Sequence, residues 1–192
     1  CDAGTLYVLN DGMLYFSIMK TISMGVDKGK DREEIDLPPV ALKPENVCAY
    51  AALKKELVNI PDVYHSSGFD FSGPARYDKM TGYHTKSMLV IPMEDAEGHV
   101  IGVIQLINKL DKNGEIISFT DDDAFVLRSL GSMAAVSLSN MQYIKQIKDF
   151  IGIATTTTSN NIIIDDTIYV GCKFEDSGTC VLGEREVATI EN

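Results

Sequence analysis

The side chains best suited to covalent, acid–base or metal chemistry are few in this sequence and lie far apart. Structural zinc ligands usually recur roughly two to five residues apart, and a catalytic set needs a nucleophile, a base and an orienting group. Neither pattern occurs, nor does a paired carboxylate motif. The sequence therefore predicts no enzyme active site and no metal centre. The residues concerned are His65, His84 and His99, and Cys1, Cys48, Cys172 and Cys180.

The cysteines leave two questions open. Cys48 lies close to a predicted helix start, where a thiolate is favoured. It is therefore either a redox-sensing thiol or, more simply, a buried apolar one. Cys172 and Cys180 flank a predicted turn and can form a disulfide only if the hairpin register allows it. The hydrophobic content removes the need for disulfide staples, which favours a reducing compartment.

Charge and composition exclude several classes of protein. The 192 residues carry 17 Lys and Arg against 28 Asp and Glu, a formal net charge of −11. A nucleic-acid binder needs a basic face to neutralise phosphates, so we expect no nucleic-acid polymer as partner. No apolar run reaches the roughly 18–20 residues of a membrane span, and Cys1–Gly4 lacks the basic start of a signal peptide. We therefore expect a cytoplasmic protein.

The first half of the chain predicts a hairpin followed by a helix. Residues 4–9 and 13–19 read as strands, because two apolar runs flank Asn-Asp-Gly, whose residues tolerate positive φ. The pattern becomes helical from Pro44 to Leu57. Residues 61–84, rich in Gly, Asp, Ser and aromatic residues, have the composition of loops and short helices.

The second half predicts two central strands and a long helix. Residues 87–93 and 100–107 are nearly continuous apolar runs, as in strands covered on both faces. The helix begins where Thr120 or Asp121 caps it and continues to about residue 150. Such a helix is longer than this sheet needs, so its far end should project or pair with a partner. One face of the helix recurs at steps of three and four: Val126, Leu130, Met133, Ser137, Met141 and Ile144.

The composition changes after Gly152. Residues 155–161 read as a linker, and residues 162–190 form short β-rich runs around a predicted turn at 175–178. We therefore predict a domain over residues 1–150 and a β-rich tail, or a fragment of a following module, over residues 151–192. So short a tail is too small for a stable core of its own, and we expect it to dock on something.

A combination of motifs resembles the GAF domain. They are Asn59–Tyr64, the Asp-x-x-Thr-Gly-Tyr-x-Thr block within 78–87, Ile91-Pro92, and Ile-Gly-Val-x-x-Leu-x-Asn-Lys from Ile101. The resemblance covers about residues 2–148. It is greatest to the GAF domains of cyclic-nucleotide phosphodiesterases, bacterial adenylate cyclases and HD-type phosphohydrolases. It implies an α/β (α+β) fold with a central antiparallel sheet and flanking helices.

The resemblance also implies a place for a small ligand, between the sheet and residues 40–85. The helix starting near Asn46 would offer backbone N–H groups to a phosphate or carboxylate. Polar side chains of the Asp-x-x-Thr block match family positions that meet the ligand, and Gln105 stands where related domains place a Glu facing the base. The candidate contacts are Asn46, Val47, Tyr64, Phe69, Tyr77, Asp78, Thr81, Tyr83, Thr85 and Gln105.

A second family signature lies beyond the strands. Phosphodiesterase-type GAF domains carry Asn-Lys, then Phe, then Asp-Glu, and this chain matches it at Asn108, Lys109, Phe119 and Asp123, with Ala124 in place of the Glu. The match predicts an ion pair that ties a strand end to the helix start, with the phenylalanine as an apolar plug. The signature therefore stabilises the fold as much as it contacts a ligand.

These features favour a non-catalytic, ligand-sensing regulatory domain of a signalling protein, with any catalytic domain elsewhere in the parent chain. The resemblance makes cyclic AMP or cyclic GMP the candidate ligand, and a homodimer through the helix over 120–150 the candidate assembly. One alternative is a ligand-free dimerisation module. Another is a cysteine-dependent reductase with a GAF fold, although the cysteine-bearing loops of such enzymes have no counterpart around residues 48–86.

Overall fold

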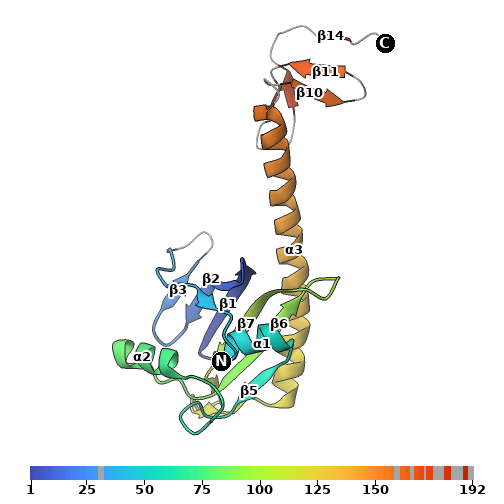
Figure 1. Ribbon diagram of the computed structural model, residues 1–192. Coiled ribbons are helices and arrows are strands. Elements are labelled where there is room, and N and C mark those ends of the chain that lie inside the picture. The colour runs from blue at the N-terminus through green and yellow to red at the C-terminus, as the bar shows by residue number, and fades with distance from the viewer. Residues whose placement is uncertain are drawn as a thin grey trace. The chain divides into compact units, whose positions relative to one another are not determined.

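The computed structural model describes residues 1–29 and 33–157 and, beyond them, several short strands. The chain forms two compact units, residues 1–139 and residues 140–192. The first unit contains all the elements on which the site depends, and Figure 1 shows their arrangement. The change of unit at 139 lies within a helix, whereas composition placed a boundary at 150. No helix of the described residues is long and apolar enough to cross a membrane.

A seven-stranded antiparallel sheet forms the centre of the first unit. Its strand order is β3-β2-β1-β7-β6-β5, and β4 pairs with one end of β2. The strands are β1 (Ala3–Asn10), β2 (Met13–Thr21), β3 (Val26–Lys28), β4 (Val40–Ala41), β5 (Val58–Ile60), β6 (Met88–Glu94) and β7 (Val100–Ile107). A separate small hairpin joins β8 (Lys109–Leu110) to β9 (Ile116–Ile117).

The predicted hairpin between the first two strands is confirmed. Asn10 pairs with Met13, and the two residues between them have positive φ, 46° at Asp11 and 73° at Gly12. Positive φ at both central residues is the type I′ geometry, whose twist matches that of the flanking strands. The Asn-Asp-Gly sequence therefore forms the turn that its composition predicts.

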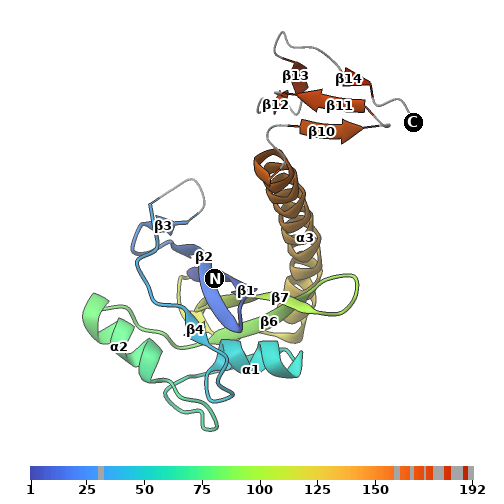
Figure 2. The same ribbon diagram turned by 45° about the horizontal axis from the view of Figure 1, so that its top comes forward.

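The two strands predicted to be covered on both faces are indeed covered. On one face, Leu89 and Ile91 of β6 pack against Leu127. On the other, Val90 and Val103 belong to a core cluster that includes the first helix. Figure 2 shows the helices α1 and α3 on opposite sides of these strands. This double cover explains why the strand sequences are apolar throughout and do not alternate.

Two short helices border the sheet on the side away from α3. Helix α1 (Val47–Lys54) begins after Asn46, whose side chain accepts a hydrogen bond from the backbone N–H of Ala49 at 3.1 Å. The prediction extended this helix to Leu57, which is wrong, because Lys55 adopts the left-handed conformation at φ 57°. Helix α2 (Ser72–Thr81) forms within the segment predicted to hold loops and short helices.

Helix α3 (Asp121–Thr157) covers the other face of the sheet and begins where the sequence predicts. Thr120 and Asp123 form a reciprocal cap: the Thr120 hydroxyl accepts from the Asp123 N–H at 3.3 Å, and the Asp123 carboxylate accepts from the Thr120 N–H at 2.7 Å. The helix ends seven residues later than the predicted end near residue 150.

The face of α3 that packs on the sheet is made largely of small residues. Ala124, Leu127 and Ala135 are buried, and a Cβ on Gly131 would lie 2.4 Å from Ile91 Cδ1. The residues that predicted the helix by their spacing lie instead on the exposed side; Val126, for example, is 56% exposed. The apolar spacing therefore identified the helix but not its buried face.

The second unit holds the remainder of α3 and the β-rich tail. Cys172 pairs with Leu182 and Phe174 with Cys180, so the two cysteines are not directly opposite one another in the register. The turn predicted at 175–178 lies outside the described residues, as do residues 158–160 of the predicted linker. The tail strands are β10 (Asn161–Ile164), β11 (Thr167–Val170), β12 (Cys172–Phe174), β13 (Cys180–Leu182) and β14 (Ala188–Thr189).

Candidate ligand-binding site

A pocket of about 460 Å³ lies between the sheet and the two short helices. Its floor comes from β1, β2 and β7, and its walls come from the first turn of α1, from α2 and from the residues after α2. Most of its lining side chains are apolar or aromatic; among the described residues that line it, only Asp70 and Arg76 carry a formal charge. A pocket of this size and character suits a small molecule with a few polar groups.

The floor of the pocket holds a buried polar cluster. The Tyr7 hydroxyl donates to Gln105 Oε1 at 3.1 Å, and Gln105 Nε2 lies 3.2 Å from Met88 Sδ. Burial raises the pKa of Tyr7 well above its usual value. Burial also raises the pKa of the Cys48 thiol to about 12. Both groups are therefore neutral near pH 7, and Cys48 lacks the thiolate that redox sensing requires.

The first turn of α1 opens into the pocket. Asn46, Val47 and Cys48 all line it. The Asn46 side chain caps the N–H of Ala49, and no helical hydrogen bond uses the N–H groups of the first turn. Together with the positive end of the helix dipole, these groups make the α1 start a place where an anionic group can bind.

Six of the ten predicted contacts line this pocket, and the other four do not. Thr85 and Gln105 lie toward the sheet, whereas Tyr77 and Tyr83 stand edge to face across the α2 side, with ring centroids 6.3 Å apart. The six lining residues are Asn46, Val47, Tyr77, Tyr83, Thr85 and Gln105. The four outside the lining are Tyr64, Phe69, Asp78 and Thr81.

Asp78 is buried beside the pocket, and both of its carboxylate oxygens are bound by protein groups. Oδ1 accepts from Thr85 Oγ1 at 2.8 Å, and Oδ2 accepts from the Thr85 N–H at 2.7 Å and from the Tyr64 hydroxyl at 2.6 Å. The hydrogen bond to Asp78 raises the pKa of Tyr64. The Tyr64 ring stacks on His84. The polar groups of the Asp-x-x-Thr block therefore bond to one another and to Tyr64 in this structure, with Asp78 holding Thr85.

Phe69 and Thr81 have local structural partners. Phe69 packs edge to face against Tyr50 and contacts Phe71, beside a second, shallower hollow next to Glu45. The Thr81 hydroxyl donates to the backbone carbonyl of Tyr77 at 2.8 Å, at the exposed end of α2.

Sequence reasoning missed several lining residues. Ala3, Thr5 and Tyr7 point to the pocket from alternate positions of β1. The period of two along this strand is the signal that would have placed them on one face. Arg76 and Met80 also line the pocket, from α2. The sequence contains no signal that would place these two residues in the pocket, because residues 61–84 were predicted only to hold loops and short helices, without bounds for α2.

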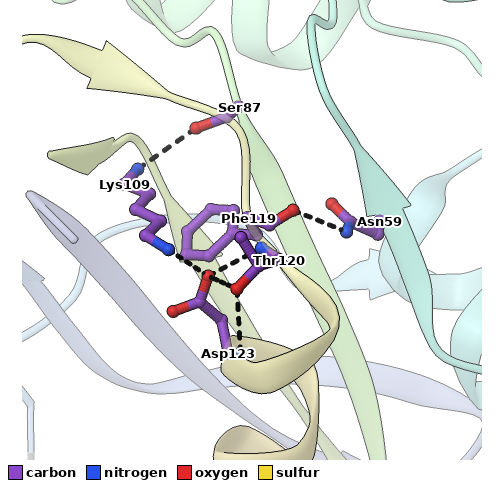
Figure 3. Close-up of polar contacts among 6 residues, drawn as sticks. All are labelled: Asn59, Ser87, Lys109, Phe119, Thr120 and Asp123. Carbon is purple, nitrogen blue, oxygen red and sulfur yellow. Dashed lines mark hydrogen bonds and ion pairs between the residues drawn. The ribbon is translucent and has the colours of Figure 1, made fainter. Parts of the chain in front are cut away.

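The Asn-Lys, Phe and Asp signature forms the scaffold that it predicts (Figure 3). Lys109 Nζ pairs with Asp123 Oδ2, which also caps the start of α3. Phe119 is buried, and its carbonyl accepts from Asn59 Nδ2 at 3.1 Å. Partial burial acts to raise the pKa of Asp123, but the hydrogen bonds from Lys109 and Thr120 outweigh it and hold the pKa below its usual value.

Asn108 lies where β7 ends and has a left-handed backbone, at φ 55°. Asparagine tolerates this conformation better than most residues. Its side chain is buried and fully bonded: Oδ1 accepts from the Lys86 N–H at 2.8 Å, and Nδ2 donates to the His84 carbonyl at 2.7 Å and to the Tyr83 hydroxyl at 3.1 Å. Asn108 therefore supports the pocket wall without lining the pocket.

One further group of titratable residues lies in the turn between β6 and β7. Atoms of Asp95, Glu97 and His99 lie within 4.8 Å of one another. Asp95 Oδ1 accepts from the backbone N–H groups of Glu97 and His99, and Asp95 Oδ2 lies 3.3 Å from His99 Nδ1. These contacts shape the turn.

Comparison with known proteins gives consistent results. Residues 1–138 match the family model of the GAF domain. Over 98 residues, the chain is 40% identical to the dual 3',5'-cyclic-AMP and -GMP phosphodiesterase 11A of Takifugu rubripes, covering 51% of this chain and 10% of the relative. It is 38% identical over 96 residues to phosphodiesterase 11 of Drosophila melanogaster, covering 50% of this chain and 6% of the relative. The chain thus spans a tenth or less of these relatives.

Solved structures agree on the fold. The GAF domain of a phosphoenolpyruvate-protein phosphotransferase from Coxiella burnetii superposes with a TM-score of 0.56 at 13% identity, covering 76% of each chain. The corresponding domain from Acinetobacter has a TM-score of 0.53 at 14% identity, covering 76% of this chain and 75% of the other. At such identities the likeness concerns the fold alone.

Proposed function

The chain belongs to the GAF domain family of regulatory and sensing domains, and from this premise we propose that it binds a cyclic nucleotide in the pocket between the sheet and the helices α1 and α2. In this proposal the domain is not itself catalytic. It reports occupancy of the pocket to another part of a signalling protein, where any catalytic domain lies.

The observation that carries the proposal is the pocket into which the α1 start opens. Its volume of about 460 Å³ is within the range of small-molecule sites. Its aromatic wall, Tyr77 and Tyr83, presents flat apolar surface of the kind on which a base can stack. Similarity to the phosphodiesterase 11 sequences supports a cyclic nucleotide over other small molecules.

Each part of the ligand has a complementary part of the pocket. We assign the phosphate to the backbone N–H groups of Val47 and Cys48, with Arg76 as the nearby cation, because these supply the donors and positive charge of the lining. We assign the base to the region of Gln105, whose amide is oriented by Tyr7. Asp78 acts as a positioning residue, since its oxygens hold Thr85 in the wall.

Calorimetry and thermal unfolding with cyclic GMP and cyclic AMP test the proposal, with 5′-GMP and 5′-AMP as controls for non-cyclic phosphates. A ligand at 100 times its Kd should stabilise the domain by about 2.7 kcal/mol. Val47→Pro removes one of the two N–H groups to which we assign the phosphate, at the first helical position, where proline is well tolerated. We expect this variant to fold and to bind the cyclic nucleotide several-fold more weakly.

A matched control keeps the test specific. A proline at Ala75 of α2 is unsuitable as the control, because it would remove the hydrogen bond that the Ala75 N–H donates to the Phe71 carbonyl. We therefore choose Leu53→Ala, which changes an exposed residue of α1 away from the pocket. It should leave affinity unchanged. Failure of both cyclic nucleotides to bind or stabilise the wild-type domain would refute the proposed ligand.

A second candidate function, dimerisation, rests on the exposed face of α3. Phe125 is 72% exposed and Met133 is 70% exposed, in a row of large apolar side chains that also includes Val126, Leu130 and Val136. A row of this kind on one helix face is typical of an interaction surface. We propose that it pairs with a second copy of the chain.

Sedimentation of the wild type and of Leu130→Lys tests this second candidate. The substitution places a charge in the middle of the row, at a residue that is 53% exposed and therefore adds little to the stability of the monomer. We expect a dimer for the wild type and a monomer for the variant, with the same thermal unfolding at high dilution. A monomeric wild type at millimolar concentration contradicts the candidate.

The pocket chemistry does not favour the reductase alternative. Cys48 lines the pocket, but its pKa of about 12, raised by burial, leaves it protonated near neutral pH. A cysteine nucleophile acts as the thiolate. Loss of methionine sulfoxide turnover on replacing the cysteines would restore this alternative.

A further inference from the structure

Residues 83–86 join α2 to β6 and line part of the pocket; we call them the strap. On the α2 side, the strap is hydrogen-bonded to Asp78, which is 7% exposed. Asp78 accepts from both the N–H and the hydroxyl of Thr85, at 2.7 and 2.8 Å. Because the donors and acceptors of this contact are buried, a movement of α2 must carry Thr85 with it or leave a carboxylate unbonded, which is costly.

On its other side, the strap is hydrogen-bonded to Asn108, which is 1% exposed. The Asn108 side chain contacts the strap three times, through the Lys86 N–H, the His84 carbonyl and the Tyr83 hydroxyl. These contacts use both the acceptor and the donors of the amide. The strap therefore cannot shift without disturbing the end of β7.

The residue after Asn108 leads directly to α3. Lys109 pairs with Asp123 in the cap of that helix, and its backbone N–H donates to Ser87 Oγ at 3.1 Å (Figure 3). Asp123 in turn holds the N–H and hydroxyl of Thr120. Polar contacts, joined by the peptide bond between Asn108 and Lys109, thus link α2 through the strap to the first turn of α3.

We propose that the strap transmits a displacement of α2 to the first turn of α3, with the Asp78 side chain joining it to α2 and the Asn108 side chain joining it to the end of β7. The inference rests on the proposed function, in which a ligand touches both α2 and the strap: Tyr77 and Met80 of α2 and Tyr83 and Thr85 of the strap line the same pocket. The two buried side chains are positioning residues. They convert occupancy of the pocket into a change at the start of the signalling helix.

Hydrogen exchange of the whole chain tests the link without any ligand. The amide of Ala124, which donates to the Thr120 carbonyl at 3.1 Å, reports on the first turn of α3, and the amide of Val103 in the central strand reports on global unfolding. Asp78→Asn replaces one of the two acceptor oxygens by an NH2 donor, so the three donors from Thr85 and Tyr64 are left with a single acceptor oxygen. We expect the protection of Ala124 to fall at least fivefold more than that of Val103.

The matched control is Asp95→Asn. Asp95 also accepts from two backbone N–H groups, but it lies in the turn between β6 and β7 and makes no contact with the strap. The ratio of the Ala124 and Val103 exchange rates should be unchanged in this variant. Should Asp78→Asn fail to fold, Thr85→Val removes only the hydroxyl donor to Asp78 and keeps the backbone N–H; the same ratio is then measured.

Asn108→Gly provides the decisive comparison, because glycine keeps the left-handed backbone and loses all three side-chain contacts. With the link already broken, Asp78→Asn should no longer change the exchange ratio. The proposal is overturned if Ala124 is as protected in Asp78→Asn as in the wild type, or if the effect of Asp78→Asn is undiminished in the Asn108→Gly background. Calorimetry with cyclic GMP is scored separately, so failure of nucleotide binding refutes the proposed ligand and not the link.

Discussion

Gly131→Ala should destabilise the protein, although the residue lies within a long helix where alanine is normally preferred. By propensity alone, the change should stabilise α3 by about 0.8–1.0 kcal/mol. The new Cβ, however, would lie 2.4 Å from Ile91 Cδ1, far inside van der Waals contact. Overpacking of a core usually costs about 1–3 kcal/mol. The two effects leave a net loss of about 0–2 kcal/mol.

Urea unfolding of a double-mutant cycle measures this balance. Ile91→Val deletes the Cδ1 atom that blocks the new methyl group and costs about 0.5–1.5 kcal/mol by itself. In that background Gly131→Ala should become stabilising by up to about 1 kcal/mol, because the next contact, to Ile91 Cγ1, is an ordinary 3.7 Å. The cycle should therefore show a coupling of about 1–3 kcal/mol, the overpacking cost that Ile91→Val removes.

Gly73→Ala is the control for helix propensity. Gly73 lies in α2, and a Cβ there meets nothing within 4 Å, so this substitution should be neutral or slightly stabilising. The reasoning is refuted if Gly131→Ala stabilises the protein as Gly73→Ala does, or if Ile91→Val has no influence on its effect. Either result would mean that the contact between Gly131 and the Ile91 side chain does not restrict this position as the structure indicates.

Three further predictions concern single contacts. Lys109→Met should cost about 1–2 kcal/mol in urea unfolding near pH 7. Because the folded-state pKa of Asp123 lies below its ordinary value of 3.8, the contribution is present above that ordinary value and is lost as the pH falls through the folded-state pKa. The gap between wild type and variant should therefore narrow in acid, and a gap that does not change with pH argues against the ion pair as its source. Asn46→Ala should cost about 1 kcal/mol by removing the cap of α1, and Asn46→Asp should retain most of that stability; equal losses in both variants would contradict the capping role. At pH 8, iodoacetamide should modify the exposed Cys1 in the folded protein and leave Cys48, with its pKa of about 12, unmodified until unfolding, as peptide mass spectrometry would show; rapid labelling of Cys48 in the folded state would overturn its assignment as a buried thiol.

The elements with strong local signals could be predicted from the sequence. The first hairpin follows from Asn-Asp-Gly between apolar runs, and the start of α3 follows from Thr120 and the acidic residues after it. Strand pairing and helix capping depend on neighbouring residues, so short-range patterns suffice. The end of α1 could not be predicted, because it depends on the left-handed backbone of Lys55, and lysine has no special preference for that conformation.

The site was only partly predictable. Motif resemblance placed Thr85 and Gln105 in the pocket lining, yet it also proposed Asp78 as a ligand contact, whereas Asp78 binds Thr85 and Tyr64. A carboxylate followed seven residues later by a threonine looks the same in sequence whether the carboxylate contacts a ligand or hydrogen-bonds to the threonine. Only the tertiary contacts of the Asp78 side chain, with Thr85 and Tyr64, distinguish the two.

The sequence by itself determined the first hairpin, the cover of β6 and β7 on both faces, and the start of α3, because each depends on residue type and local spacing. The ion pair between Lys109 and Asp123 followed from the resemblance to the family signature. Only the tertiary structure decided which side of α3 is buried. The close approach at Gly131 favours a stripe of small residues over the larger apolar row that remains exposed. It likewise decided the pocket, since β1, α1, α2 and β7 contribute lining side chains that are spread along the chain from Ala3 to Ile107. Surfaces assembled from distant segments depend on how the elements pack, and that information is absent from any one segment.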